Sequence, residues 1–319
     1  MTRWEMVIAK NSSEFMTKEK STSPLVFCII LNLNGRDDLL ETLASVLSIA
    51  YSDFRVVVVD NGSTDGSQEA VRSRFPGVTL IDTGENLGFG GGNNVGMQYA
   101  LDQGADWILL LNNDITVSTT LIDELLAAAA TDETIGALCP KIYYYDRPDV
   151  LWYAGGKISF FAGLISHRGL RRKDHGQYDR IVDTDYITGC AFMVRATVLR
   201  QVGLFDPVYH PAYVEDADLS LRIQRAGFRT VFVPAGKVWH KVSAFSGGGM
   251  TAMKTRLKII NTLTFFRRYS RWYHWLTIPL FIAAGSVFFL VRELFRGNFE
   301  LVKALVSGMA AALKKQKTG

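Results

Sequence analysis

The chain has 319 residues, of which 48% are hydrophobic, and a formal net charge of +4. This length accommodates one large domain, or a domain with an appendage. Because the basic residues do not form one dominant block, the composition argues against a nucleic-acid-binding protein. Cys28, Cys139 and Cys190 lie far apart in apolar segments, which predicts buried thiols in a reducing compartment, not a disulfide framework or a zinc cluster.

Residues 1–23 are polar and contain no apolar core of signal-peptide length, so we expect a flexible N-terminal extension and no export signal. From Leu25 to Tyr144, continuous apolar runs alternate with segments of helical periodicity. This alternation predicts a parallel sheet that is covered on both faces. The predicted strands are 25–33, 54–59, 78–81, 107–111 and 135–144, and the predicted helices are 37–49, 66–74, 93–101 and 121–130.

The alternation stops at about residue 146. Residues 147–180 are rich in glycine, aromatic and charged residues, which indicates a hairpin or mobile loops. A strand is expected at 185–194, a helix at 215–226 and a short strand at 230–233. The second half is therefore predicted to be an α+β unit that packs onto the first.

The C-terminal segment, residues 251–319, is predicted to be a membrane-associated helical tail. Aromatic residues precede an apolar stretch at 276–291, which is at the short end for a membrane span of about 20 residues. Basic residues flank this stretch on both sides, so charge indicates no orientation. The alternative is a buried helical hairpin of a soluble protein. Six later residues are predicted to share one face of an interfacial helix: Phe299, Val302, Leu305, Val306, Met309 and Leu313.

Asp114 follows the apolar run 107–111 and the pair Asn112 and Asn113. Such a strand delivers polar oxygens to the carboxyl edge of a parallel sheet, where open α/β sheets bind their ligands. A carboxylate at that edge is well placed to hold a hard cation against a diphosphate. The alternative is a loop aspartate that caps the next helix, near Ser118. The motif alone does not favour either interpretation, a metal-binding or a helix-capping aspartate.

Two further segments suggest nucleotide binding. Asp60 ends a strand and precedes a polar turn, so it could accept hydrogen bonds from a nucleobase or ribose; an Asx turn is the commoner explanation. The glycine-rich residues 88–94 lead into a helix, where backbone amides could meet a phosphate; a flexible loop with positive φ is the alternative. Asn93 stands where Gly-x-Gly-x-x-Gly requires glycine, and no Gly-Lys-Ser/Thr is present, which disfavours dehydrogenases and P-loop proteins.

Glu215 and Asp216 precede a predicted helix, and Asp216 is a candidate general base. Its alternative role is helix capping, and a helix N-terminus would lower its pKa unless burial compensated. Asp218 and Arg222 are four residues apart and are predicted to form an exposed salt pair. His240 precedes a possible mobile lid at 246–249 and could join Asp114 in a metal site at a diphosphate, although a lone histidine is more often simply packed.

Together, these segments resemble the family-2 glycosyltransferases of the GT-A fold, over about residues 24–245. The resemblance lies in Val-Val-Asp-Asn-Gly-Ser-Thr-Asp at 58–65, Glu-Asn-Leu-Gly-Phe at 85–89 and Leu-Leu-Leu-Asn-Asn-Asp at 109–114. It continues through Ile-Thr-Gly-Cys at 187–190, Val-Gly-Leu-Phe-Asp at 202–206, Glu-Asp-Ala-Asp-Leu at 215–219 and Val-Trp-His at 238–240. The order and spacing are specific, and the rhamnosyltransferase-like branch is the most similar, with galactofuranosyltransferases nearby.

The resemblance implies an α/β fold of the GT-A type, a mixed sheet with a hydrophobic helical tail. Residues 24–145 would bind the nucleotide sugar and residues 146–250 the acceptor. Asp216 would deprotonate the acceptor, and Asp114, assisted by His240, would hold a divalent metal, Mn or Mg. Asn112 replaces the first aspartate of the Asp-x-Asp pattern, which removes one anionic ligand. The expected nucleotide-sugar-binding residues are Asn32, Asp60, Asn86, Gly88, Asn94, Asn112 and Asn113.

The implied reaction is inverting transfer of a sugar, such as rhamnose, from a nucleotide-diphosphate donor to a glycan or polyprenyl-linked acceptor for cell-surface polysaccharide. The expected location is the cytoplasmic face of the plasma membrane, with no nucleic-acid partner. Glu215, Trp152 and Tyr143 are candidate acceptor contacts; for the two aromatic residues, packing is an equally good explanation. The alternatives are a nucleotidyltransferase and a non-catalytic, membrane-bound scaffold that binds sugar nucleotides.

Overall fold

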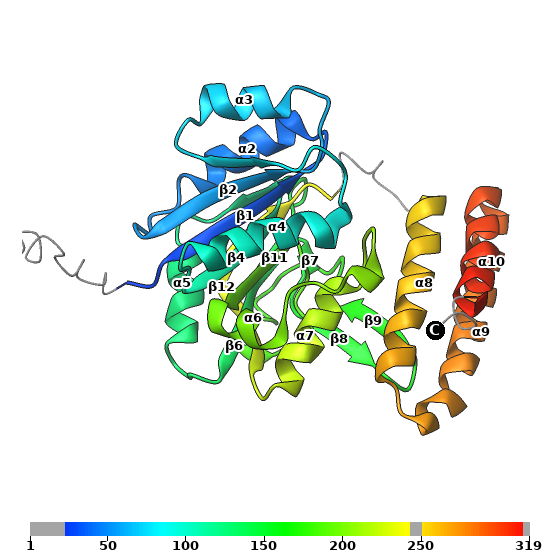
Figure 1. The fold of residues 1–319 in the computed structure, drawn as a ribbon. Coiled ribbons are helices and arrows are strands. Elements are labelled where there is room, and N and C mark those ends of the chain that lie inside the picture. The colour runs from blue at the N-terminus through cyan, green and yellow to red at the C-terminus, as the bar shows by residue number, and fades with distance from the viewer. Residues whose placement is uncertain (1–22, 243–250, 315–319) are drawn as a thin grey trace, which may run out of the picture.

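The structure is a computed structural model that describes residues 23–242 and 251–314. The predicted N-terminal extension, except Ser23, and the predicted lid at 246–249 lie outside the described residues. A ten-stranded mixed sheet has the order β10-β12-β6-β11-β4-β1-β2-β3, with β5 beside β12 and β7 beside β6 (Figure 1). Its strands are β1 Val26–Asn32, β2 Phe54–Asp60, β3 Thr79–Asp82, β4 Trp107–Asn112, β5 Ile115–Val117, β6 Ile135–Tyr144, β7 Leu151–Tyr153, β10 Val182–Asp183, β11 Ala191–Arg195 and β12 Arg229–His240.

The first half of the sheet follows the sequence prediction. Strands β3, β2, β1 and β4 are parallel. Successive residues of β1 and β4 are buried, so both faces of these strands are covered, as their continuous apolar runs predicted. The connecting helices are α2 Arg36–Val46, α3 Ser67–Arg74, α4 Gly88–Asp102 and α5 Leu121–Ala129.

Helix α4 begins at Gly88, five residues earlier than predicted, so the glycine-rich segment is helical and not a flexible loop. Gly88 has a φ of 74° and lies against the carbonyl of Pro211. A Cβ on Gly92 would lie 2.4 Å from the Leu31 side chain, and one on Gly96 would lie 2.4 Å from Ile29. The later glycines therefore let α4 approach β1 closely, where it crosses in front of β1 and β4 in Figure 1.

The second half adds antiparallel pairs, so the sheet is mixed, as the resemblance to the GT-A fold implied. Strand β11 is antiparallel to both β4 and β6, whereas β12 is parallel to β6. Strand β12 extends seven residues beyond its predicted end, to His240, because its last part pairs with both β5 and β6. The hairpin expected within 147–180 is present as β8 Gly156–Ser159 and β9 Leu164–His167. Helix α6 Ala196–Val202, the 3-10 helix η1 Pro207–Tyr209 and α7 Glu215–Arg225 complete this half.

The C-terminal segment forms α8 Ala252–Tyr269, η2 Trp272–Leu276, α9 Ile278–Phe295 and α10 Phe299–Lys314. Helix α8 lies between the β8–β9 hairpin and α10 in Figure 1, and its Phe265 and Phe266 are fully buried in the main core. Helix α10 packs on α8 through small side chains, and a Cβ on Gly308 would lie 3.3 Å from the Arg256 backbone. The predicted interfacial face is therefore divided, because Leu305 is buried while Phe299 and Val306 are exposed.

Candidate active site

Asp114 and His240 meet at the carboxyl edge of the sheet. Asp114 lies between β4 and β5, and His240 ends β12, where it pairs with Ile115 of β5. This pairing brings Nε2 of His240 to 3.1 Å from Oδ1 of Asp114. Both side chains are buried, and the edge of the Trp152 ring packs on the imidazole at a centroid distance of 4.6 Å.

The environment of His240 favours its protonated form, which has to lose a proton before the imidazole can bind a metal. Burial alone would lower the pKa of His240, but the neighbouring Cys190 sulfur and the Asp114 carboxylate outweigh it and raise the pKa to about 10. The carboxylate and imidazole atoms fit a divalent cation, since adjacent ligands about 2.1 Å from an octahedral cation lie about 3 Å apart. Because no group of three or more ligating side chains occurs among the described residues, a cation here needs further ligands from a diphosphate or water.

Asn32, Asp60 and Asn113 link the ends of three neighbouring strands. Nδ2 of Asn113 donates to Oδ1 of Asn32 (2.7 Å), and Nδ2 of Asn32 donates to Oδ2 of Asp60 (3.1 Å). The backbone N–H of Ser63 and Nε2 of Gln68 both donate to Oδ1 of Asp60, each at 2.8 Å. Asp60 is fully buried, and its carboxylate is saturated by protein donors. It therefore holds the turn after β2, and its contact with a nucleoside stays a prediction. Asn112, at the end of β4, is partly exposed beside this network.

The amides of residues 87–89, at the start of α4, are engaged within the protein, and phosphate binding by the glycine-rich segment stays a prediction. The N–H of Leu87 donates to Asn61 (3.0 Å), that of Gly88 to Asn86 (2.9 Å), and that of Phe89 to the Pro211 carbonyl (2.7 Å). The side-chain amide of Asn94 is also engaged, because it both donates to and accepts from the Phe205 backbone. Gly88 and Asn94 thus position α4, and donor contact by Asn86, Gly88 or Asn94 stays a prediction.

Asp216 lies in the first turn of α7, after a strained backbone. Tyr213 and Val214 have φ values of 80° and 79°, which non-glycine residues rarely adopt. The N–H of Gly189 donates to Oδ2 of Asp216 (2.9 Å), and the N–H of Ala217 donates to Oδ1 (2.8 Å). Burial raises the pKa of Asp216 above its ordinary value, although these amides oppose the shift. Burial thus outweighs the lowering expected from a helix N-terminus.

Glu215 is buried beside Asp216, with 4% of its surface exposed. Its Oε2 has no hydrogen-bond partner among the described residues. Burial, followed by the charge of Asp216, raises the pKa of Glu215 to about 8. Burial and the neighbouring Asp216 carboxylate therefore favour the neutral form of Glu215.

Gly189 and Cys190, which are adjacent in the chain, join the Asp216 part of the site to the part that contains Asp114 and His240. Gly189 donates to Asp216, and the next residue, Cys190, lies beside His240 and Asp114. The carbonyl of Cys190 accepts from the N–H of Asn112 (3.0 Å), which anchors the segment to the end of β4. The three predicted chemical groups therefore converge on this segment.

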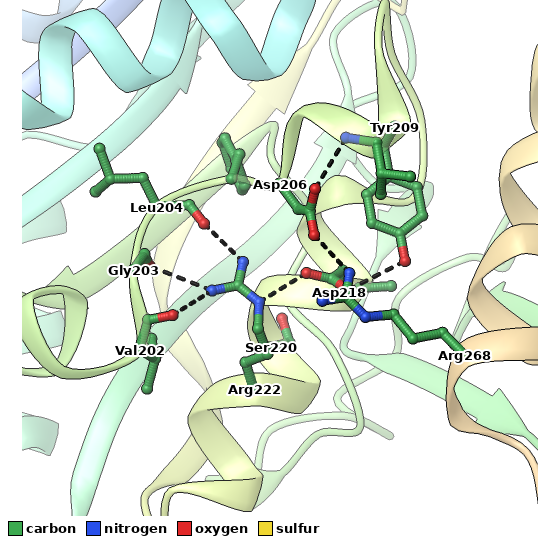
Figure 2. A network of polar contacts seen from close by, with 12 residues as sticks. Val202, Gly203, Leu204, Asp206, Tyr209, Asp218, Ser220, Arg222 and Arg268 are labelled. Atoms are coloured by element: carbon green, nitrogen blue, oxygen red, sulfur yellow. Dashed lines mark hydrogen bonds and ion pairs between the residues drawn. The ribbon is translucent and has the colours of Figure 1, made fainter. Parts of the chain in front are cut away.

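The predicted pair of Asp218 and Arg222 is not exposed. Asp218 is completely buried, and it accepts from Nε of Arg222 (2.7 Å) and from the hydroxyls of Tyr209 (3.0 Å) and Tyr269 (2.6 Å). Arg222 also donates to the carbonyls of residues 202–204 (Figure 2). Sequence spacing identified the pair but not its burial, because Tyr269 comes from the distant helix α8. This network joins α7 and α8 behind the catalytic candidates.

The two aromatic acceptor candidates differ in their surroundings. The hydroxyl of Tyr143 donates to Asp174 (2.7 Å) and its ring stacks with Trp239, so its contacts are those of a packed side chain. Trp152 is half-buried against His240 and His167, at the edge of the site. Lys258 and Asn261 of α8 also lie close to Asp216, and the sequence analysis missed them because α8 was assigned to the tail.

Comparisons with known proteins identify the family and the fold of the chain. The sequence profile of Glycosyl transferase family 2 matches residues 27–203. The N-acetylglucosaminyl-diphospho-decaprenol L-rhamnosyltransferase of Mycobacterium tuberculosis is 32% identical over 227 residues, which are 65% of this chain and 73% of the relative. Rhamnosyltransferase WbbL of Escherichia coli is 27% identical over 230 residues, covering 68% and 83%. The structure of mannosyltransferase PcManGT from Pyrobaculum calidifontis, in complex with GDP-Man and Mn2+, matches with a TM-score of 0.56 at 15% identity, covering 97% of this chain and 93% of that chain.

The fold and the sequence profile define a glycosyltransferase with the GT-A fold, as the resemblance predicted. The chain belongs to glycosyl transferase family 2, in its rhamnosyltransferase-like branch. It is therefore an enzyme, and the nucleotidyltransferase and scaffold alternatives are set aside.

Proposed function

We propose that this enzyme transfers a deoxyhexose, rhamnose in the first instance, from a nucleoside-diphosphate donor to a diphosphate-linked lipid glycan, with inversion at the anomeric carbon. The relatives named as rhamnosyltransferases support the sugar, and the mycobacterial name supports a diphospho-polyprenol acceptor. The observation that carries the proposal is the convergence of Asp114, His240 and Asp216 on residues 189–190.

In this mechanism Asp216 takes the proton from the acceptor hydroxyl as that oxygen attacks the donor sugar. A raised pKa brings its basicity closer to working pH, and the Gly189 N–H keeps the carboxylate oriented. Inversion needs no covalent enzyme intermediate, so no nucleophilic serine or cysteine is required. Asp114 and His240 would hold a divalent cation, Mn or Mg, which offsets charge on the departing diphosphate. Trp152 would cover the imidazole at the acceptor side.

The test of the base is Asp216→Asn, with Asp102→Asn on the exposed end of α4 as the matched control. We expect transfer to fall by about 10²–10⁴-fold, the usual contribution of a positioned base, with donor affinity retained. The measurements are nucleoside-diphosphate release with dTDP-rhamnose and a lipid-linked acceptor, and donor binding by calorimetry. Unchanged turnover in Asp216→Asn would remove this residue from the mechanism.

The metal assignment has a separate test that does not depend on turnover. Binding of Mn2+ to the full chain is measured by electron paramagnetic resonance, with and without nucleoside diphosphate. We expect binding that strengthens with the diphosphate and weakens at least tenfold in Asp114→Ala and His240→Ala. Equal binding by wild type and both variants would show that the cation is held elsewhere.

Membrane association at the cytoplasmic face of the plasma membrane is the last part of the proposal. Among the described residues, α9 is the one helix that is long and apolar enough to span a bilayer by length and composition. Only 11% of this apolar stretch is buried inside the structure. Its 18 residues rise about 27 Å, close to the roughly 30 Å hydrocarbon core. Liposome flotation of the wild type and of Leu280→Glu/Phe288→Glu tests this, since both side chains are exposed. Equal flotation of the two proteins would contradict a role for α9.

A further inference from the structure

Helix α8 holds the backbone that precedes the catalytic candidate. Nδ2 of Asn261 donates to the carbonyls of Tyr209 (2.8 Å), Ala212 (2.8 Å) and Tyr213 (3.2 Å). Asn261 is 1% exposed, and Tyr213 lies three residues before Asp216. The face of α8 that carries Asn261 therefore borders the turn that leads into Asp216.

Lys258 lies one turn before Asn261 on that face. Its ammonium group is 5.2 Å from the centroid of the Tyr213 ring, so it lies over the side chain of a residue in the turn before Asp216. No hydrogen bond or close ion pair with a described side chain contributes to its pKa; Asp216 acts on it only as a more distant charge. Lys258 thus presents a cation near the Asp216 turn, and no carboxylate among the described residues forms a close ion pair with it.

A second cation lies beside Lys258. Lys254 is four residues earlier, so the two side chains share one face of α8. Burial lowers the pKa of Lys254, and the charge of Lys258 lowers it further. Burial of the ammonium group also lowers the pKa of Lys258. The side chain as a whole is exposed. The two lysines therefore both contribute positive charge to this face of α8.

The anion that fits this position best is the diphosphate of the acceptor. Asp114 and His240, at the other end of the Gly189–Cys190 segment, are the candidates for the donor diphosphate. A lipid-linked acceptor carries its own diphosphate next to the sugar whose hydroxyl must reach Asp216. Helix α8 also leads through η2 into the exposed apolar helix α9, which suits a lipid chain.

We infer that Lys258, supported by Lys254, binds the diphosphate of the lipid-linked acceptor, with Asn261 as the residue that positions this face of α8 against the Asp216 turn. The inference deepens the proposed function and rests on it. The donor nucleoside diphosphate offers the same chemistry, so the experiment distinguishes the two sources.

The experiment uses the full chain and measures binding, so it does not require turnover. Farnesyl diphosphate, farnesol and dTDP are titrated separately into wild type, Lys258→Ala, Lys258→Arg and Lys303→Ala. Lys303 is the matched control, because it is an exposed lysine of α10 paired with Glu300. Loss of a charge-assisted contact should weaken farnesyl diphosphate binding by about tenfold or more in Lys258→Ala. Binding of farnesol and dTDP should not change, and Lys258→Arg should bind nearly as wild type.

Two outcomes would overturn the inference. Weaker dTDP binding in Lys258→Ala, with farnesyl diphosphate unaffected, would assign the lysine to the donor. Equal losses for farnesyl diphosphate and farnesol, or equal losses in Lys303→Ala, would indicate a general effect on the helices. A steady-state activity assay tests the proposed reaction separately from the anion site. If wild type binds farnesyl diphosphate through Lys258 but transfers no sugar to any acceptor, the proposed reaction fails while the anion site stands.

Discussion

The turn after β2 and the start of α7 both bury carboxylates, but they surround them differently. Asp60 accepts hydrogen bonds from Asn32, Ser63 and Gln68, and Asp218, later in α7, is likewise saturated. In Glu215, by contrast, Oε2 has no hydrogen-bond partner among the described residues. The neighbouring Asp216 charge adds to the effect of burial on the pKa of Glu215. A buried acid whose oxygens both accept hydrogen bonds stabilises the fold, whereas the partly unsatisfied Glu215 favours its neutral form.

The largest expected effect on stability comes from Asp218→Ala. This change leaves Arg222 and two tyrosine hydroxyls without their acceptor, and breaking a buried pair costs about 3–5 kcal/mol. Urea unfolding measures the loss. Asp183→Ala is the control, because Asp183 forms an equally short but exposed pair with Arg229 and should cost about 1 kcal/mol or less. Equal losses for the two variants would break the distinction between the acids.

Glu215→Gln should change the pH dependence of stability. The folded pKa of about 8 lies above the ordinary value of 4.5, so folding takes up a proton between these values. Stability should therefore fall as pH rises from 5 to 8, by up to about 1.4 kcal/mol per pH unit. Glutamine carries no charge, so the variant should show a flatter profile in unfolding experiments across this range. The exposed Glu85→Gln serves as control, and identical slopes in all three proteins would refute the prediction.

Asn261→Ala tests whether α8 belongs to the catalytic unit. The change leaves carbonyl groups of residues 209, 212 and 213 without their donor, which should cost about 2 kcal/mol. We also expect a lower kcat with unchanged donor affinity, because the turn before Asp216 loosens. Thr264→Ala is the control on the same helix, since its hydroxyl bonds only within α8. A loss of stability without any change in kcat would limit Asn261 to a structural role.

The smallest effect is expected from Gln68→Ala. It removes one of several donors to Asp60, so stability should fall by only about 1 kcal/mol. Thermal unfolding measures the change, with Gln98→Ala on the exposed side of α4 as the control. A loss as large as that of Asp218→Ala would show that Asp60 depends on this single donor.

Local sequence patterns predicted the first half of the fold well, because each buried parallel strand is a short apolar run with polar residues at its end. The same logic selected Asp60 and Asp114 as candidates, and the resemblance added Asn32 and the roles of Asp216 and His240; these roles stay predictions. The patterns failed where pairing is not local. The end of β12 is a strand only because β5 and β6 lie beside it, and the glycine-rich start of α4 is helical because β1 lies beneath it.

The sequence alone determined the family, the order of the first strands and helices, and the acids available for chemistry, because these depend on residue identity and short-range spacing. Only the tertiary structure decided which acids accept several hydrogen bonds and which acid has its pKa raised by burial. It also brought Asp114 to His240 and Lys258 to the Asp216 turn. These relations depend on burial and on contacts between segments distant in the chain, which spacing along the chain does not encode.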